Sequence, residues 1–234
     1  MINNRAAAWF ALVLGSVALC SPARAQEIAA ADAVDPLAPL AEGADPAQPY
    51  SEAASELTNW IIASGDNGGL PFIVIDKIVA EVFVFDARGQ PLGATPALLG
   101  VTPGDESAEG VGDRELSDIK PEDRTTPAGR FVANFGPASG NRTVLWVDYA
   151  TSISLHPVIT TNKKERRLQR LNSPSSDDNR ITYGCINVPA AFYADVVLPL
   201  LRDTAGVVYI LPETKPLKEV FQSYSAPQQQ AYAH

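Results

Sequence analysis

Short apolar stretches of the length and composition typical of β-strands follow one another through the middle of the chain. A turn signal at 86–90, Asp-Ala-Arg-Gly-Gln, predicts a hairpin. Residues 101–123 are polar and rich in Gly and Asp, which predicts a long surface loop. The expected strands cover 72–75, 81–85, 97–99, 130–135, 143–147, 152–155 and 207–211.

Helical spacing is confined to two segments. In 51–63 the apolar positions recur at intervals of three or four residues, and Ser51 is a suitable N-cap. In 189–202 a second helix is predicted. Its apolar side is formed by Phe192, Val196, Val197 and Leu200. The pattern as a whole predicts a β-rich α+β domain with a few helices.

The two ends of the chain differ in composition from the middle. Residues 1–25 have a polar, basic start, an apolar stretch and the small-residue site Ala-Arg-Ala, and therefore predict a cleaved signal peptide. Residues 26–50, dominated by Ala, Pro, Asp and Glu, predict a flexible linker. The folded domain is then expected at 51–212, followed by a flexible tail at 213–234.

Charge and export narrow the classes of function. The chain carries 18 Lys and Arg against 27 Asp and Glu, a net charge of −9, which argues against nucleic-acid binding. The apolar part of the signal is shorter than the ~20 residues that span a bilayer, so no membrane span is expected after cleavage. A lipoprotein alternative would lipidate Cys20. The expected location is the periplasm.

Removal of the signal leaves a single cysteine, Cys185. An unpaired thiol in an exported protein suggests a nucleophile, which needs a base because a free thiol is mostly protonated at neutral pH. His156 ends a predicted strand, whereas His234 is the last residue of the tail, so the predicted pair is Cys185 with His156. Gly184 beside the thiol allows a backbone turn that can direct amides at an oxyanion. A small buried cysteine and a surface histidine are the alternatives.

Several segments resemble the signature of the L,D-transpeptidase (YkuD-like) catalytic domain, in the same order along the chain. Residues 182–187 read Thr-Tyr-Gly-Cys-Ile-Asn, His156 follows a strand, and 126–131 read Thr-Pro-Ala-Gly-Arg-Phe. Together with an opening hairpin at 72–100, the resemblance covers about 71–212. It implies a mixed β-sandwich or barrel with a few peripheral helices.

The resemblance also implies a chemistry, namely a cysteine enzyme that acts on the tetrapeptide stems of peptidoglycan through an acyl-enzyme. It makes Cys185 the nucleophile and His156 the base, with a backbone carbonyl such as that of Pro157 orienting the imidazole. The amides of Gly184 and Cys185 become oxyanion-hole candidates. The remaining implied site residues are Thr182, Tyr183 and Asn187 in the cysteine loop and Thr126 and Arg180 as substrate-binding candidates.

Two features depart from the family pattern. Tyr183 stands where the family usually has a second His. The spacing from His156 to Cys185 is 29 residues, roughly ten longer than the common family pattern, and the extra length lies in 162–179, the insertion. The insertion carries a basic run, which predicts either a lid for acidic substrate groups or a solvated face. Its basic residues are Lys163, Lys164, Arg166, Arg167 and Arg170.

Other functions remain open at this stage. The acyl acceptor can be an amine of another stem, an envelope protein, or water, in which case the enzyme is an L,D-carboxypeptidase. A non-catalytic peptidoglycan-binding module is a further alternative. The Ser-x-x-Lys pattern at 117–120 lacks its companion Lys-Thr-Gly and is a chance match. Two histidines far apart cannot supply a usual zinc site, so no metal and no cofactor is expected.

Overall fold

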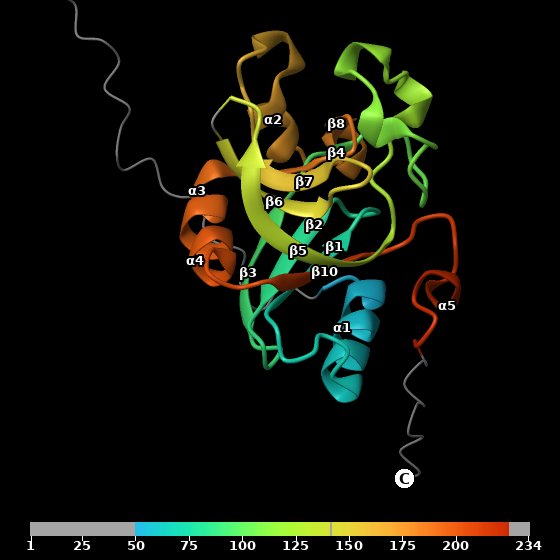
Figure 1. The fold of residues 1–234 in the computed structure, drawn as a ribbon, viewed down its shortest axis with the longest axis vertical. Helices are drawn as coiled ribbons and strands as arrows, with labels where there is room; N and C mark the ends of the chain where they lie inside the picture. The colour runs from blue at the N-terminus through green and yellow to red at the C-terminus, as the bar shows by residue number, and fades with distance from the viewer. Residues whose placement is uncertain (1–49, 141, 225–234) are drawn as a thin grey trace, which may run out of the picture. The chain divides into compact units, whose positions relative to one another are not determined.

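The computed structural model describes residues 50–140 and 142–224 (Figure 1), all within the second of two compact units, 39–234. The predicted signal peptide and nearly all of the predicted linker lie outside the described residues. The strands are β1 Phe72–Asp76, β2 Glu81–Phe85, β3 Pro91–Pro96, β4 Leu99–Gly100, β5 Gly129–Ala138, β6 Arg142–Asp148, β7 Ile153–Pro157, β8 Arg180–Thr182, β9 Ile186–Val188 and β10 Gly206–Ile210.

The helices are short apart from the first. They are α1 Glu52–Ser64, α2 Arg167–Leu171, α3 Ala190–Phe192, α4 Leu198–Leu201 and α5 Leu217–Val220. A π-helical turn at Tyr193–Val197 joins α3 to α4, so the helix expected at 189–202 is present. The expected N-cap of α1 is also present, since Ser51 Oγ accepts from the Ala54 amide at 3.1 Å. No described helix has both the length and the hydrophobicity to cross a membrane.

Eight strands form one sheet in the order β3-β2-β1-β10-β5-β6-β7-β9, and β4 pairs with β8. Within the eight-stranded sheet, neighbours are antiparallel except for β1 with β10 and β7 with β9, and the β4–β8 pair is also parallel. Beyond β3, the backbone of Leu98 exchanges hydrogen bonds of 2.8 and 2.9 Å with Asn187 of β9. Because this pair links the two ends of the sheet, the sheet is a nearly closed barrel, as the resemblance implied.

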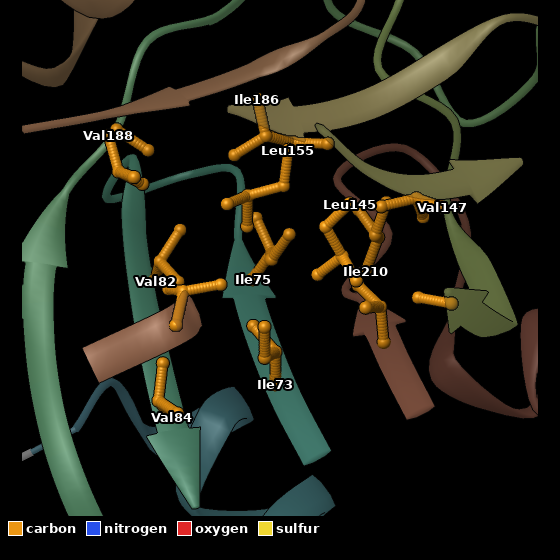
Figure 2. Packing of buried hydrophobic residues seen from close by; sticks show 14 of the residues in the cluster. Ile73, Ile75, Val82, Val84, Leu145, Val147, Leu155, Ile186, Val188 and Ile210 are labelled. Atoms are coloured by element: carbon orange, nitrogen blue, oxygen red, sulfur yellow. The ribbon is translucent and has the colours of Figure 1, made fainter. Parts of the chain in front are cut away.

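The central strands are buried on both faces. Ile73 and Ile75 of β1 point into the barrel interior, where side chains from most strands meet (Figure 2). Phe72 and Val74 point the other way, into a second cluster with α1 and the C-terminal segment. Burial on both faces explains why these strands read as continuous apolar runs rather than as alternating ones.

The C-terminal segment corrects one expectation. Residues 213–224, predicted as the start of a flexible tail, are packed against the domain. Phe221 and Tyr224 are buried in the second core cluster, and Glu213 forms an ion pair with Arg180. The Pro, Gln and Ser content of this segment gave no sign of this packing, because its few apolar residues are scattered and its other contacts are polar. The rest of the predicted tail, 225–234, lies outside the described residues.

Three strands were not predicted. β3 contains two prolines and a glycine, and it is an edge strand of the sheet, where proline is tolerated. β8 and β9 are three residues each, too short for a periodic signal. The predicted loop at 101–123 is confirmed and contains three single 3₁₀ turns.

Candidate active site

Strands β7 and β9 place the candidate catalytic residues on one face. Leu155 pairs with Ile186 and His156 with Asn187, and the side chains of Leu155 and Ile186 are fully buried in the barrel. Because side chains alternate across a strand, His156 and Asn187 lie on the opposite face from these core residues. Cys185, directly before β9, joins them there. The predicted pair therefore occupies neighbouring positions on the same face.

The imidazole of His156 is oriented by its own strand. Its Nδ1 lies 2.8 Å from the carbonyl oxygen of Pro157, as expected from the sequence. Since a carbonyl only accepts, Nδ1 carries the proton and Nε2 presents its lone pair. Burial, and then the nearby positive charges of Arg142 and Arg167, lower the pKa of His156 despite the opposing Pro157 hydrogen bond. The ring is therefore neutral at pH 7.

Asn187 joins His156 to the insertion. Its Nδ2 lies 3.1 Å from His156 Nε2, and its Oδ1 accepts a 2.7 Å hydrogen bond from Arg167 Nη1. The guanidinium can only donate, so the orientation of the amide is fixed by this contact. Asn187 is 1% exposed. The side chain predicted to shape the loop thus contacts the base itself.

The thiol of Cys185 is partly exposed and unpaired. Its Sγ lies 3.5 Å from Ser154 Oγ and donates to the Ser152 carbonyl at 3.6 Å. Among the described residues these are its hydrogen-bond partners, while His156 Nε2 is bonded to Asn187. Thiol and base thus lie on one face of β7 and β9, and the described residues show no hydrogen bond between them.

The backbone around Cys185 is held in a tight turn. Thr182 Oγ1 donates to the Cys185 carbonyl at 2.7 Å and accepts from the Gly184 amide at 3.1 Å. Gly184 has φ +123°, a conformation that side chains rarely adopt. Because the Gly184 amide is used by Thr182, the Cys185 amide is the stronger of the two oxyanion-hole candidates.

Thr126 supports this turn from the neighbouring segment. Its hydroxyl donates to the Gly184 carbonyl at 2.7 Å and accepts from the Gly100 amide at 2.9 Å. The residue has no exposed surface. A buried hydroxyl with both of these partners inside the protein favours a positioning role over the substrate contact expected from the sequence.

Tyr183 packs through its ring. The guanidinium carbon of Arg124 lies 3.9 Å from the ring centroid, within the range of a cation–π contact. Arg124 also donates from Nε and Nη2 to the Ile119 carbonyl, at 3.1 and 2.9 Å. Tyr183 therefore connects the cysteine loop to the long loop before β5.

Arg180 belongs to a different network. Its guanidinium bonds Glu213 at 2.5 Å and the Lys77 carbonyl at 2.8 Å. Lys77 is itself buried, pairs with Asp105 at 2.8 Å and donates to the Thr126 carbonyl at 3.0 Å. These contacts favour a structural role for Arg180, in place of the substrate contact expected from the sequence.

Ser154 and Arg167 were missed as site residues. Ser154 could have been found, because it precedes His156 by two on a predicted strand and so shares its face. Arg167 could not be singled out among the five basic residues of the insertion, since its position depends on how 162–179 folds back onto β9. The Ser-x-x-Lys pattern at 117–120 covers the end of an exposed 3₁₀ turn and the two residues after it.

Comparison with protein-family models and with curated proteins finds no match. Among solved structures, the chain is similar to the catalytic domain of an L,D-transpeptidase from E. faecium (14% identity, 60% of this chain and 96% of that chain, TM-score 0.38). An L,D-transpeptidase from Mycobacterium smegmatis is also similar (16% identity, 60% and 58%, TM-score 0.35).

A third similar structure is the helical cell shape determining protein Pgp2 (K307A mutant) from Campylobacter jejuni (12% identity, 71% of this chain and 58% of that chain, TM-score 0.40). The chain thus spans less than two thirds of the M. smegmatis and C. jejuni structures. L,D-transpeptidases therefore recur among the similar solved structures.

Proposed function

We propose that this protein is an exported cysteine L,D-transpeptidase that transfers acyl groups from the tetrapeptide stems of peptidoglycan. The observation that carries the proposal is the shared face of β7 and β9, on which Cys185 lies beside a neutral, oriented His156. A partly exposed thiol on the same face as a neutral histidine whose Nε2 can accept a proton is the minimum set for nucleophilic acyl transfer. The signature segments in matching order support the substrate class.

In the first step, Cys185 Sγ attacks the carbonyl of the peptide bond between diaminopimelate and the terminal D-alanine. The thiol proton passes to His156 Nε2, and the negative oxygen of the tetrahedral intermediate accepts a hydrogen bond from the Cys185 amide. Collapse of the intermediate expels the amine of D-alanine, which takes the proton from His156. The product is a thioester on Cys185.

For that proton transfer, His156 Nε2 must exchange Asn187 for the thiol. His156 pairs with Asn187, and Cys185 directly precedes β9, so the exchange takes place among side chains on one face. Pro157 keeps Nδ1–H fixed throughout and stabilises the imidazolium that forms. Ser154, 3.5 Å from Sγ, keeps the sulfur on the open face.

The thioester is resolved by the acceptor. An amine from a second stem gives a cross-link, and an amine from an envelope protein tethers that protein to the wall. Water as acceptor gives an L,D-carboxypeptidase, the alternative function of the same site. The choice depends on how well the site admits an amine and excludes water.

The test is incubation of the purified mature protein with disaccharide-tetrapeptide, followed by mass spectrometry of the products. Loss of D-alanine together with a new dimer supports a transpeptidase, and the same loss without a dimer supports a carboxypeptidase. An unchanged tetrapeptide, bound or unbound, would rule out both enzymes, and a bound one would leave a binding module. We expect the dimer.

Two variants make the result specific. Cys185→Ala removes the nucleophile and should abolish the loss of D-alanine. Ser117→Ala removes the serine of the chance Ser-x-x-Lys pattern and should retain wild-type turnover. If Cys185→Ala kept turnover and Ser117→Ala lost it, the chemistry would belong to the loop at 101–123 rather than to the face of β7 and β9.

A further inference from the structure

We propose that Arg167 is a positioning residue for His156: by holding Asn187 Oδ1 it directs the Asn187 amide at His156 Nε2 and keeps the resting base neutral. The contacts define this role without any substrate, while its meaning for turnover rests on the proposed acyl transfer. Arg167 would thereby give the insertion at 162–179 a function beyond that of a solvated basic face.

The contact between the insertion and the site is firmly held. Arg167 Nη1 donates to Asn187 Oδ1 at 2.7 Å, and its Nε donates to Glu165 Oε2 at 2.5 Å. The Arg167 side chain is only 13% exposed. Arg170 adds a 2.9 Å hydrogen bond from its Nε to the Glu165 carbonyl. The other basic side chains of the run are not equivalent, since Arg166 is exposed and bonds Gln169.

The hydrogen bonds from Arg167 through Asn187 and His156 to Pro157 have fixed donors and acceptors. Arg167 can only donate, so Asn187 must present its oxygen to it and its NH₂ to His156. His156 Nε2 must then accept, which requires the neutral ring because Nδ1–H already donates to Pro157. If Nε2 were protonated, its N–H would face the NH₂ group of Asn187, and two donors cannot bond each other. Rotation of the Asn187 amide would relieve that conflict only by facing its NH₂ toward Arg167.

The charges that face His156 act in the same direction. Arg142 on β6 and Arg167 on α2 are both positive and both disfavour the imidazolium. The groups in contact with the ring are neutral, namely the Pro157 carbonyl and the Asn187 amide. Proton transfer from Cys185 Sγ to Nε2, which breaks S–H and forms N–H, therefore requires the Arg167–Asn187 arrangement to yield.

The test is an NMR titration of the His156 ring in the full-length mature protein, assigned by its disappearance in His156→Gln. Arg167→Met removes the donor and the charge and keeps a long side chain. We expect His156 to protonate at a higher pH in Arg167→Met than in the wild type. Arg167→Lys, which retains a charged donor, should restore values near the wild type. Arg166→Met is the matched control and should leave the titration unchanged.

The second readout is the rate of Cys185 alkylation by iodoacetamide at neutral pH. Because the imidazolium form becomes easier to reach, Arg167→Met should react about fivefold faster, the factor that one net hydrogen bond of typical strength represents. Asn187→Asp is a second variant that keeps Arg167 and its Glu165 pair. Its carboxylate can accept from both Arg167 and His156, so it should raise the protonation pH further.

An unchanged titration or an unchanged alkylation rate in both Arg167→Met and Asn187→Asp would overturn the role of Arg167. Neither readout uses peptidoglycan. If both change as expected while the wild-type protein leaves the tetrapeptide intact, the positioning role stands and the proposed transpeptidase function fails. If the tetrapeptide is processed and the variants behave like the wild type, the proposed function stands and the positioning role fails.

Discussion

Thr126 Oγ1 donates a 2.7 Å hydrogen bond to the carbonyl of Gly184, a residue 58 positions later in the chain. This bond connects the Thr-Pro-x-Gly segment of the signature with the turn that carries Cys185. Through this bond the first segment holds the backbone of the second. The nucleophile is thus positioned by a buried hydroxyl as well as by its own strand.

Thr126→Val tests this link with a side chain of the same shape. The Gly184 carbonyl and the Gly100 amide lose their partner inside the protein, which should lower the free energy of unfolding by about 1 to 3 kcal/mol. Turnover should fall further than stability explains, since Cys185 is no longer fixed. Urea unfolding and the tetrapeptide assay measure the two effects. Thr125→Val changes the neighbouring threonine and should retain most turnover.

Gly184→Ala should be far more damaging than the same substitution at a glycine with open space around it. A Cβ at Gly184 would lie 2.7 Å from both Ile153 Cδ1 and the Thr125 carbonyl, at φ +123°. Strain and overlap together should cost roughly 2 kcal/mol or more and abolish turnover. Gly110→Ala is the control, because its φ is +65° and nothing lies within 4 Å of the added Cβ. Equal unfolding free energies for the two variants would contradict the close packing at Gly184.

The buried network below the site should matter for stability. Burial opposes ionisation of Asp105, but hydrogen bonds from Lys77, Thr214 and the Glu213 amide outweigh it, so its pKa lies well below the usual range. Asp105→Asn leaves Lys77 buried with only the 3.4 Å contact to Glu213 as an ion pair and should cost roughly 3 kcal/mol. Glu106→Gln, which breaks an exposed pair, should have little effect. Similar unfolding curves for the two variants would contradict this assignment.

The central part of the fold could be predicted because its strands leave strong signals. β1, β2 and β10 are buried on both faces, so the chain is continuously apolar there. β9, which carries the site, could not be predicted, since three residues give no period. β9 is a strand because it pairs with β7 and with Leu98, and these pairings form only in the folded chain.

The candidate site, too, could be predicted only in part. Cys185 and His156 follow from residue type and the signature, and the Pro157 carbonyl from adjacency to His156. Arg167, on the short helix α2 of the insertion, and Arg124, at the end of the long loop before β5, reach the site from segments whose course cannot be predicted from local sequence pattern. Long-range contacts made by loop residues leave no periodic trace in the sequence.

The lowered pKa of His156 gives stability a pH dependence. The ring is neutral in the folded protein and protonates near pH 6.5 when unfolded, so the unfolded state binds the proton first. The stabilising contribution of the neutral His156 ring is therefore fully present above about pH 6.5, and it is lost as the pH falls toward the lower pKa of the folded state. The loss of unfolding free energy between pH 7 and pH 5.5 should be smaller in His156→Gln than in the wild type. An identical loss in both proteins would show that burial does not hold the ring neutral.

The acyl-enzyme on Cys185 is the central claim, and intact-protein mass spectrometry after rapid quenching with disaccharide-tetrapeptide tests it most directly. We expect a mass increase equal to the disaccharide-tripeptide acyl group, located on the peptide that contains Cys185, and absent from Cys185→Ala. Ser117→Ala should show the same adduct as the wild type. Turnover of the tetrapeptide by Cys185→Ala, or an adduct on any other residue, would contradict the mechanism.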